Sequence, residues 1–326
     1  MDPDGDVVIV LENPNAPFAV WDGAPAQDQD CMALKPVKFR VSSKHLQLAS
    51  PVFKAALKGP WIEGTVTKRG CQEISTSDWD VEAFRIVLNV IHGCNRDVPH
   101  LITLEMLCKV AVLVDYYQCH EAFNFSSFVW VNSLRGSFSE TYGRDLILWL
   151  CISCVFHDNT IFKAATKISI GESPENIRAL GLPIPQRVIG TPFGRSVYVA
   201  TYLTRPTEHI NRQRINAVGF ITLSLSGLKH DLISGSKGCT SECRYMFLGW
   251  LVTCMGKQKL DRNPQPFYGV SADAATKGIR CSASPRWNNY CCFEKLRLNA
   301  QSSIDKAMGH VHPLELKDYM FVPKDV

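Results

Sequence analysis

The stretch VKFRVSSKHLQLASPVFKAAL, residues 37–57, contains the change of hydrophobic period on which the fold depends. Residues 37–41 alternate apolar and polar side chains, which predicts a strand with one wet face. From Ser43 to Leu57 the apolar side chains recur at helical spacing instead. Ser50 can cap a helix and Pro51 fits a first helical turn, so this part is predicted to form two short helices that meet at Ser50.

The residues before this stretch predict one more strand and a long loop. Asp6–Leu11 is a short run of aliphatic side chains behind one Asp, which is typical of a strand buried on both faces. Residues 12–36 contain four prolines and show no periodicity, and we expect them to form a loop insertion. Phe18 and Trp21 are its aromatic side chains, and the simpler interpretation is that they attach the loop to the core.

The residues after it predict a short strand and two longer helices. Ile74 lies in the strand candidate, and Ser77 or Asp78 is expected to cap a helix that Gly93 ends. Apolar side chains then repeat at three and four residues from Thr103 to about His120. Residues 1–125 are therefore predicted to form an α+β domain in which a short sheet is flanked by a cluster of helices.

These residues, in this order, resemble the BTB/POZ family. The resemblance rests on five features that follow one another over about 120 residues: Asp6-Val7; Phe39-Arg40-Val41 with Ser43-Lys44-His45-Leu46; Ala49-Ser50-Pro51-Val52-Phe53; Asp78 with Ala83-Phe84 and Ile91-His92-Gly93; and Leu107 with Ala111-Val112 and Asp115-Tyr116-Tyr117. Within the family, the chain is most similar to fungal members that continue into a helical C-terminal extension.

The resemblance implies that the chain binds proteins. Family members pair with another BTB domain or present a partner to a cullin-type ubiquitin ligase. Cullin-binding members carry an apolar residue, any residue and a Glu after the second helix of the pair, and Trp61-Ile62-Glu63 matches that pattern. With Tyr116 and Tyr117, these residues are the expected partner-binding side chains. The alternative is that Trp61 packs over the helices and Glu63 is a solvated turn residue.

Two further expectations concern the type of BTB protein. A nuclear, transcription-linked regulator without a ligase role is the alternative to a substrate adaptor for ubiquitin ligation. Strand-swapped BTB homodimers use an N-terminal helix before the first strand, whereas only five residues precede Asp6 here. A homodimer of that kind is therefore not expected.

The second half of the chain is predicted in three parts. Residues 126–187 are expected to form a helical extension, in which Ser173 caps a helix that Gly181 ends. Glycines and prolines interrupt residues 188–244, which are therefore predicted to be irregular. This segment also departs from the BTB/POZ family, and an altered gene model would explain the departure. Residues 245–326 are predicted to form a partly helical tail.

The sequence argues against catalysis. It contains no glycine-rich phosphate loop, no zinc-protease pattern and no nucleophile elbow, so we expect no enzyme activity and no cofactor. The thirteen cysteines are expected to be reduced thiols, because their number is odd and no export signal accompanies them. Cys151 with Cys154, and Cys239 with Cys243, have the spacing of metal or redox pairs, but buried structural thiols and no metal are expected.

Charge and hydropathy bear on the compartment. Residues 1–120 hold eleven Lys and Arg against fifteen Asp and Glu, and residues 121–326 hold twenty-four against sixteen. Nucleic-acid binding by the basic half is not expected, because no stacking pattern or recognition helix accompanies the charges. The N-terminus is acidic, and the strongly apolar uncharged runs Leu146–Phe156 and Tyr245–Gly256 are shorter than the ~18 residues of a membrane span. The cytosol or nucleus is the expected location.

Overall fold

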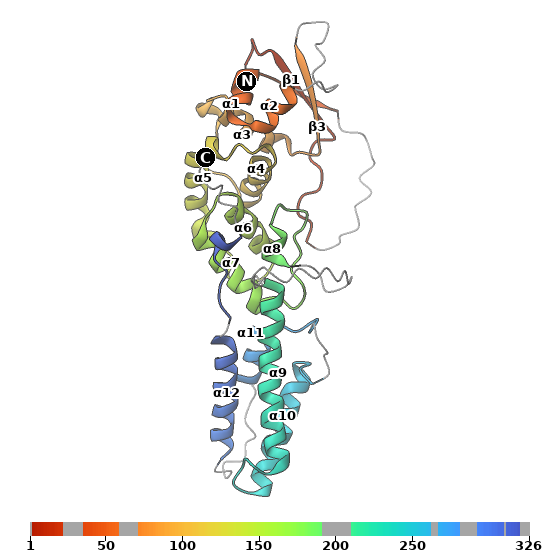
Figure 1. Ribbon diagram of the computed structural model, residues 1–326, viewed down its shortest axis with the longest axis vertical. Helices are drawn as coiled ribbons and strands as arrows, with labels where there is room; N and C mark the ends of the chain where they lie inside the picture. Colours follow the sequence, from red (N-terminus) through yellow and green to blue (C-terminus); the bar gives the residue numbers. More distant parts are fainter. Residues whose placement is uncertain are drawn as a thin grey trace, which may run out of the picture. The chain divides into compact units, whose positions relative to one another are not determined.

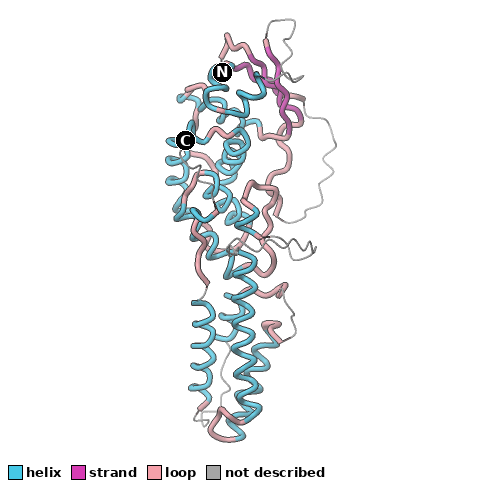
Figure 2. Tube along the Cα trace, viewed as in Figure 1, coloured by secondary structure: helices cyan, strands magenta, loops and turns pink. Residues whose placement is uncertain are grey.

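The computed structural model of the 326-residue chain describes residues 2–21, 35–58, 71–190, 210–261, 267–280, 292–309 and 311–319. The described residues have an α+β fold that is mostly helical and contains one three-stranded sheet (Figures 1 and 2). They form two compact units. Unit 1 comprises residues 1–139, 143–161 and 179–184, and unit 2 comprises residues 140–142, 162–178 and 185–326.

The sheet of unit 1 has β1 (Val7–Glu12) in the middle. It pairs antiparallel with β2 (Val37–Val41) and parallel with β3 (Gln72–Ser77). All three strands occur where the sequence predicts strands, and β1 is largely buried, as expected for its aliphatic run. The expected loop insertion begins one residue later than predicted, because Glu12 belongs to β1, and residues 13–21 have no regular structure.

The rest of the regular structure of unit 1 is helical, and it extends beyond the predicted boundary at residue 125. The helices are α1 (Ser43–Ala49), α2 (Pro51–Lys58), α3 (Val81–Ile91), α4 (Leu104–Tyr117), α5 (His120–Leu134), α6 (Arg144–Val155) and the start of α7 (Asn159–Glu172), with short 3-10 helices at Asn95–Asp97 and Arg135–Ser137. Residue 125 lies in the middle of α5, and α6 packs against α4. The unit therefore includes much of the predicted helical extension.

The helix predicted from Ser173 to Gly181 is absent, because residues 173–185 contain no helix. The other helix ends predicted for unit 1 agree with the structure except at one place. Gly93 has a left-handed backbone (φ +69°) after α3, and the Thr103 hydroxyl accepts from the Met106 amide at 3.2 Å to cap α4. Helix α3, however, is capped by Asp80, whose Oδ1 accepts from the amides of residues 82 and 83 at 3.0 Å. Ser77 and Asp78 were the expected caps, and both lie before the true start of the helix.

Several residues that carry the family resemblance bond to one another across long stretches of sequence. The Asp6 carboxylate accepts from the amide and the hydroxyl of Ser43, at 2.8 and 2.6 Å. The buried Ser50 hydroxyl accepts from the amide of Phe53 at 3.0 Å and donates to the carbonyl of Tyr117 at 2.5 Å. The predicted break between α1 and α2 is thus confirmed, and the capping residue also fixes the end of α4.

His92 joins the end of α3 to the start of α1. Its Nε2 accepts from the Ser42 amide at 3.0 Å, which requires the other ring nitrogen, Nδ1, to carry the proton and to donate to the Leu88 carbonyl at 2.8 Å. Burial lowers the pKa of His92; the bond to Leu88 and the carboxylate of Asp2 act against this shift, and His45, whose ring lies 5.1 Å away, adds to it. The ring is therefore held in its neutral form.

This arrangement predicts that unit 1 loses stability in mild acid. The pKa of His92 in the folded chain lies below its unfolded value of 6.5, so the unfolded chain takes up a proton first as the pH falls. The stability that neutral His92 contributes is therefore complete above pH 6.5 and is lost as the pH falls through the folded pKa. At pH 7.5, unit 1 of the wild type should unfold at a higher urea concentration than unit 1 of His92→Gln. The difference between the two urea midpoints should become smaller below pH 6.5. A difference that stays constant with pH would contradict the neutral-histidine assignment.

Unit 2 is helical throughout its regular structure. Besides the rest of α7 it contains α8 (Gln186–Ile189), α9 (Ile210–Ser234), α10 (Ser241–Lys257), α11 (Ala272–Arg280), α12 (Phe293–Gly309) and a 3-10 helix at Leu316–Asp318. Helix α9 contacts α10, α11 and α12 (Figure 1). The prediction of irregular structure for residues 188–244 is wrong at Ile210–Ser234, which form a single helix of 25 residues, and at the start of α10. Residues 191–209 of that segment lie outside the described residues. No helix in the described part of the chain is both long and apolar enough to cross a bilayer.

Candidate protein-interaction surface

Three aromatic side chains meet where β3 leads into α3 and α4 ends. Trp79 contacts Tyr116 edge-on, with ring centroids 5.1 Å apart, and Tyr116 contacts Tyr117 in the same manner at 4.9 Å. The indole nitrogen of Trp79 donates to the Thr76 hydroxyl at 2.8 Å, which fixes the orientation of the ring. Tyr116 is 56% exposed, so this cluster presents one aromatic face to solvent.

Tyr117, in contrast, belongs to the core. It is 4% exposed and stacks on Phe53 with ring centroids 4.2 Å apart. Its hydroxyl lies 3.1 Å from that of Thr76, and burial raises its pKa to about 12. The expectation that Tyr117 contacts a partner is therefore wrong for the folded unit, because its neighbours already cover the ring.

An apolar cavity of about 240 Å³ lies beside Trp79. Phe18, from the loop after β1, and residues 180–182 form part of its wall, together with the side chains of α3 and α4. The Lys109 ammonium lies 5.6 Å from the centroid of the Phe18 ring. Phe18 thus attaches its loop to the core, as predicted, and in doing so shapes a hollow.

Asp80 and Lys109, two of the charged side chains that line this cavity, belong to one connected network of ion pairs. Lys109 donates to Asp80 at 2.9 Å and also pairs with Glu105 at 2.9 Å, and Glu105 pairs with Arg144 at 2.7 Å. Burial disfavours the ammonium of Lys109, but the bonds to Asp80 and Glu105 outweigh burial and raise its pKa. These four groups balance one another, whereas Asp78, which also lines the cavity, accepts from Asn13 at 2.6 Å and from Ser77 at 2.7 Å and is not part of the network. The rest of the lining is mainly apolar, which suits an apolar side chain.

Helix α5 presents an aromatic pair that sequence reasoning did not single out. Phe125 and Phe128 are both exposed, and their three-residue spacing puts them on one side of the helix. Phe123 and Trp130 are buried on the opposite side. Helix α5 therefore carries aromatic side chains on two opposite sides, whereas a helix that only packs against a core needs them on one. The spacing of these aromatic residues in the sequence could have revealed this.

The remaining predicted residues divide between described and undescribed parts of the chain. Trp61, Ile62 and Glu63 lie outside the described residues, after the end of α2 at Lys58.

Cys151 and Cys154 are buried in α6, as predicted for structural thiols. The thiol of Cys151 meets that of Cys108, and this bond and burial keep its pKa well above the ordinary value, while burial raises that of Cys154 to about 12. Both thiols are poor nucleophiles in this state.

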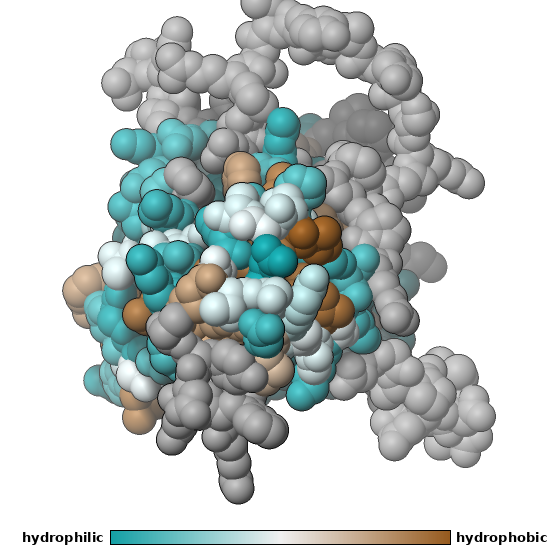
Figure 3. All heavy atoms as spheres, turned by 90° about the horizontal axis from the view of Figure 1, so that it is seen from below, coloured by the Kyte–Doolittle hydropathy of each residue, from teal (hydrophilic) through white to brown (hydrophobic). Residues whose placement is uncertain are grey.

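The chain matches no family model, no curated protein and no solved structure. The geometry of unit 1 offers an exposed aromatic side chain, Tyr116, close to a mainly apolar cavity. On the face that Figure 3 shows, hydrophilic and near-neutral side chains cover most of the described surface, and hydrophobic ones form small groups. Because Trp79 belongs to the aromatic cluster and also lines the cavity, the two together form the candidate interaction surface.

Proposed function

We propose that unit 1 is a BTB/POZ-type domain and that the chain acts by binding other proteins. The observation that carries this proposal is the long-range bonding among the residues of the resemblance, in which Asp6 holds Ser43 and Ser50 holds Tyr117. Residues that recur together in a family for structural reasons should contact one another in the fold. The order of two strands, a helix pair, a third strand and two further helices also agrees with that family.

The surface around Trp79 supports a protein as the ligand. Aromatic side chains that are rigidly held and partly exposed contribute most of the binding energy at many protein interfaces. Trp79 is fixed by its bond to Thr76, and Tyr116 stands beside it. The apolar cavity between Phe18 and Lys109 would accept a side chain of the partner.

We further propose that the chain is a substrate adaptor for a cullin-type ubiquitin ligase. The support is the Trp61-Ile62-Glu63 pattern, which follows α2 at the family position. A Trp side chain can anchor in a pocket of the partner, and a nearby carboxylate can orient it through charge-assisted hydrogen bonds. This assigns the scaffold contact to residues 61–63 and leaves the Tyr116 surface for another partner.

A binding experiment with a purified cullin tests the adaptor role. The double variant Trp61→Ala, Glu63→Ala is expected to bind at least thirty-fold more weakly than the wild type, which corresponds to a hot-spot loss of about 2 kcal/mol. The matched control is Glu242→Ala with Tyr245→Ala, which removes an exposed carboxylate and an exposed aromatic ring from α10 and should bind normally.

Two results separate the adaptor role from the broader proposal. If the wild-type chain binds no cullin, the adaptor role is rejected. Affinity purification from cells then tests binding as such: partners recovered with the wild type should be depleted with Tyr116→Ala and retained with Tyr245→Ala. If neither variant changes the set of recovered proteins, the Trp79–Tyr116 surface is not the interaction site.

A further inference from the structure

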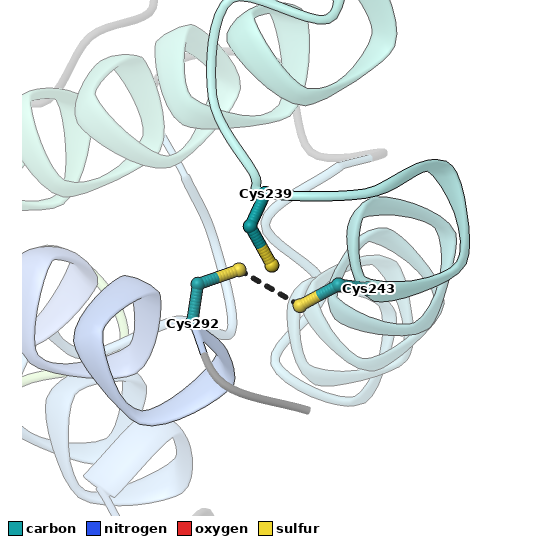
Figure 4. Close-up of side chains that lie close together, drawn as sticks. All are labelled: Cys239, Cys243 and Cys292. Atoms are coloured by element: carbon teal, nitrogen blue, oxygen red, sulfur yellow. Dashed lines mark hydrogen bonds between the residues drawn. The ribbon is translucent and has the colours of Figure 1, made fainter. Parts of the chain in front are cut away.

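Three cysteines from separate parts of unit 2 meet at one place. Cys239 follows the turn after α9, Cys243 lies in the first turn of α10, and Cys292 directly precedes α12. Their sulfur atoms all lie within 4.8 Å of one another, with 2.8 Å between Cys243 and Cys292, and Figure 4 shows the three side chains pointing toward a common centre. The expectation of buried thiols holds for Cys243 but not for Cys239, which is exposed.

The turn before Cys239 is shaped to bring its thiol back toward α10. Gly235 and Gly238 have left-handed backbones, with φ of +81° and +104°, and a Cβ at Gly238 would lie 3.2 Å from the Cβ of Arg244. The ammonium of Lys237 pairs with Asp231 of α9 at 2.8 Å, which ties the middle of the turn to the helix before it. The thiol of Cys239 is therefore held by a defined turn and not by a free loop.

The starts of both helices favour a negatively charged thiolate. Cys243 is in the first turn of α10, where the hydroxyl of Thr240 accepts from its amide at 3.2 Å, and Cys292 precedes the first turn of α12. Both residues therefore lie at the positive end of a helix dipole, and each helix has 17 residues. Two of the three thiols thus have the setting that stabilises a metal-bound thiolate.

We propose that Cys239, Cys243 and Cys292 bind a thiophilic metal ion, namely Zn²⁺. Zinc takes thiolates at about 2.3 Å in tetrahedral geometry, which puts the sulfur atoms about 3.8 Å apart. The thiols of Cys243 and Cys292 must separate by about 1 Å from their present contact to reach this spacing, and no distance to Cys239 has to shorten by more than about 1 Å. Three thiolates leave the fourth position for water or another ligand.

The third thiol distinguishes this site from a simple disulfide. A disulfide between Cys243 and Cys292 would use two sulfur atoms and give no role to Cys239, although the glycine turn directs that side chain to the same centre. Burial raises the pKa of Cys243 to about 12, so binding of the ion must displace its proton. The bound ion would connect positions 49 residues apart and hold the start of α12 against α10.

Metal analysis of the purified full chain tests this site. Chain that is reduced, incubated with Zn²⁺ and freed of excess ion should retain about one zinc per molecule. Cys239→Ser should retain less than a tenth of that amount, and because Cys239 is exposed, this change leaves the core intact. The matched control is Cys94→Ser in unit 1, which removes a partly exposed thiol outside the cluster and should retain zinc like the wild type.

A second measurement identifies the ligands. When Co²⁺ replaces zinc, the wild type should show thiolate-to-cobalt charge-transfer absorption, and Cys239→Ser and Cys292→Ser should each weaken it. The proposal is overturned if the wild type retains no zinc, if Cys239→Ser retains as much as the wild type, or if peptide mapping finds Cys243 and Cys292 joined by a disulfide in chain isolated from a reducing cytosol. The site lies in unit 2, so these results do not depend on the function proposed for unit 1.

Discussion

Replacing Leu225 by Asp is expected to unfold unit 2, whereas the same replacement at Leu223 is expected to leave it folded. Both residues lie in α9, but Leu225 is 0% exposed within the core of unit 2 and Leu223 is 70% exposed. An unpaired carboxylate in an apolar interior costs several kcal/mol in addition to the lost burial of the Leu side chain. The total is at least ~4 kcal/mol, a large part of the ~5–15 kcal/mol by which a domain is stable.

Peptide-resolved hydrogen exchange of the full chain measures this difference. In Leu225→Asp, the amides of α9, α10 and α12 should exchange as in an unfolded chain, while those of the sheet in unit 1 should keep their protection. In Leu223→Asp, α9 should exchange as in the wild type. Equal behaviour of the two variants would mean that α9 does not bury the face described above.

Phe84→Ala is expected to lower the free energy of unfolding of unit 1 by ~3–5 kcal/mol. Phe84 is fully buried in α3, where it meets Phe39 of β2 edge-on at 5.4 Å and Tyr117 of α4 at 6.0 Å between ring centroids. The ring therefore joins the sheet to two helices, and its removal leaves a cavity that these elements cannot close without moving.

Phe125→Ala is the matched control, since it removes the same ring from an 80% exposed position on α5. Its effect on the free energy of unfolding should stay within ~0.5 kcal/mol. Urea titration monitored by hydrogen exchange in β1, β2 and α4 gives both values. A loss below 1 kcal/mol for Phe84→Ala would show that the ring is not part of the core.

The elements of unit 1 could be predicted because their signals are local. The alternation in residues 37–41, the cap at Ser50 and the left-handed Gly93 each depend on a few neighbouring residues. The cap of α3 was misplaced because Ser77, Asp78 and Asp80 all have capping side chains, and only the backbone path selects Asp80. Ser173 also has a capping side chain, but its hydroxyl donates to the carbonyl of Glu175, and the next helix begins only at Gln186.

Helix α9 was missed because its glycines were interpreted as interruptions. Val218, Ile221, Leu225 and Leu228 recur at three and four residues and are all buried, but Gly219 and Gly227 lie among them. In the fold, the Phe267 ring packs over Gly219, where a Cβ would lie 3.6 Å from the ring. A glycine that serves tertiary packing looks the same in sequence as one that ends a helix.

The candidate sites could be predicted only in part. Tyr116 and Tyr117 are neighbours in the same motif, yet one is exposed and the other is in the core, and only the packing of α4 separates them. The pair Cys239 and Cys243 was visible from its spacing, whereas Cys292 joins it across 49 residues. Such a contact depends on how α10 and α12 pack, and short-range patterns do not encode it.

The interior position of α6 sets a limit on how unit 1 can be divided. All ten residues from Leu146 to Val155 are buried, and α4 is one of the elements that cover them. A fragment that stops at residue 125 lacks α6, so the apolar side chains of α4 that α6 covers would be exposed to solvent. Such a piece would self-associate through those side chains, so the minimal foldable fragment of unit 1 extends at least through α6.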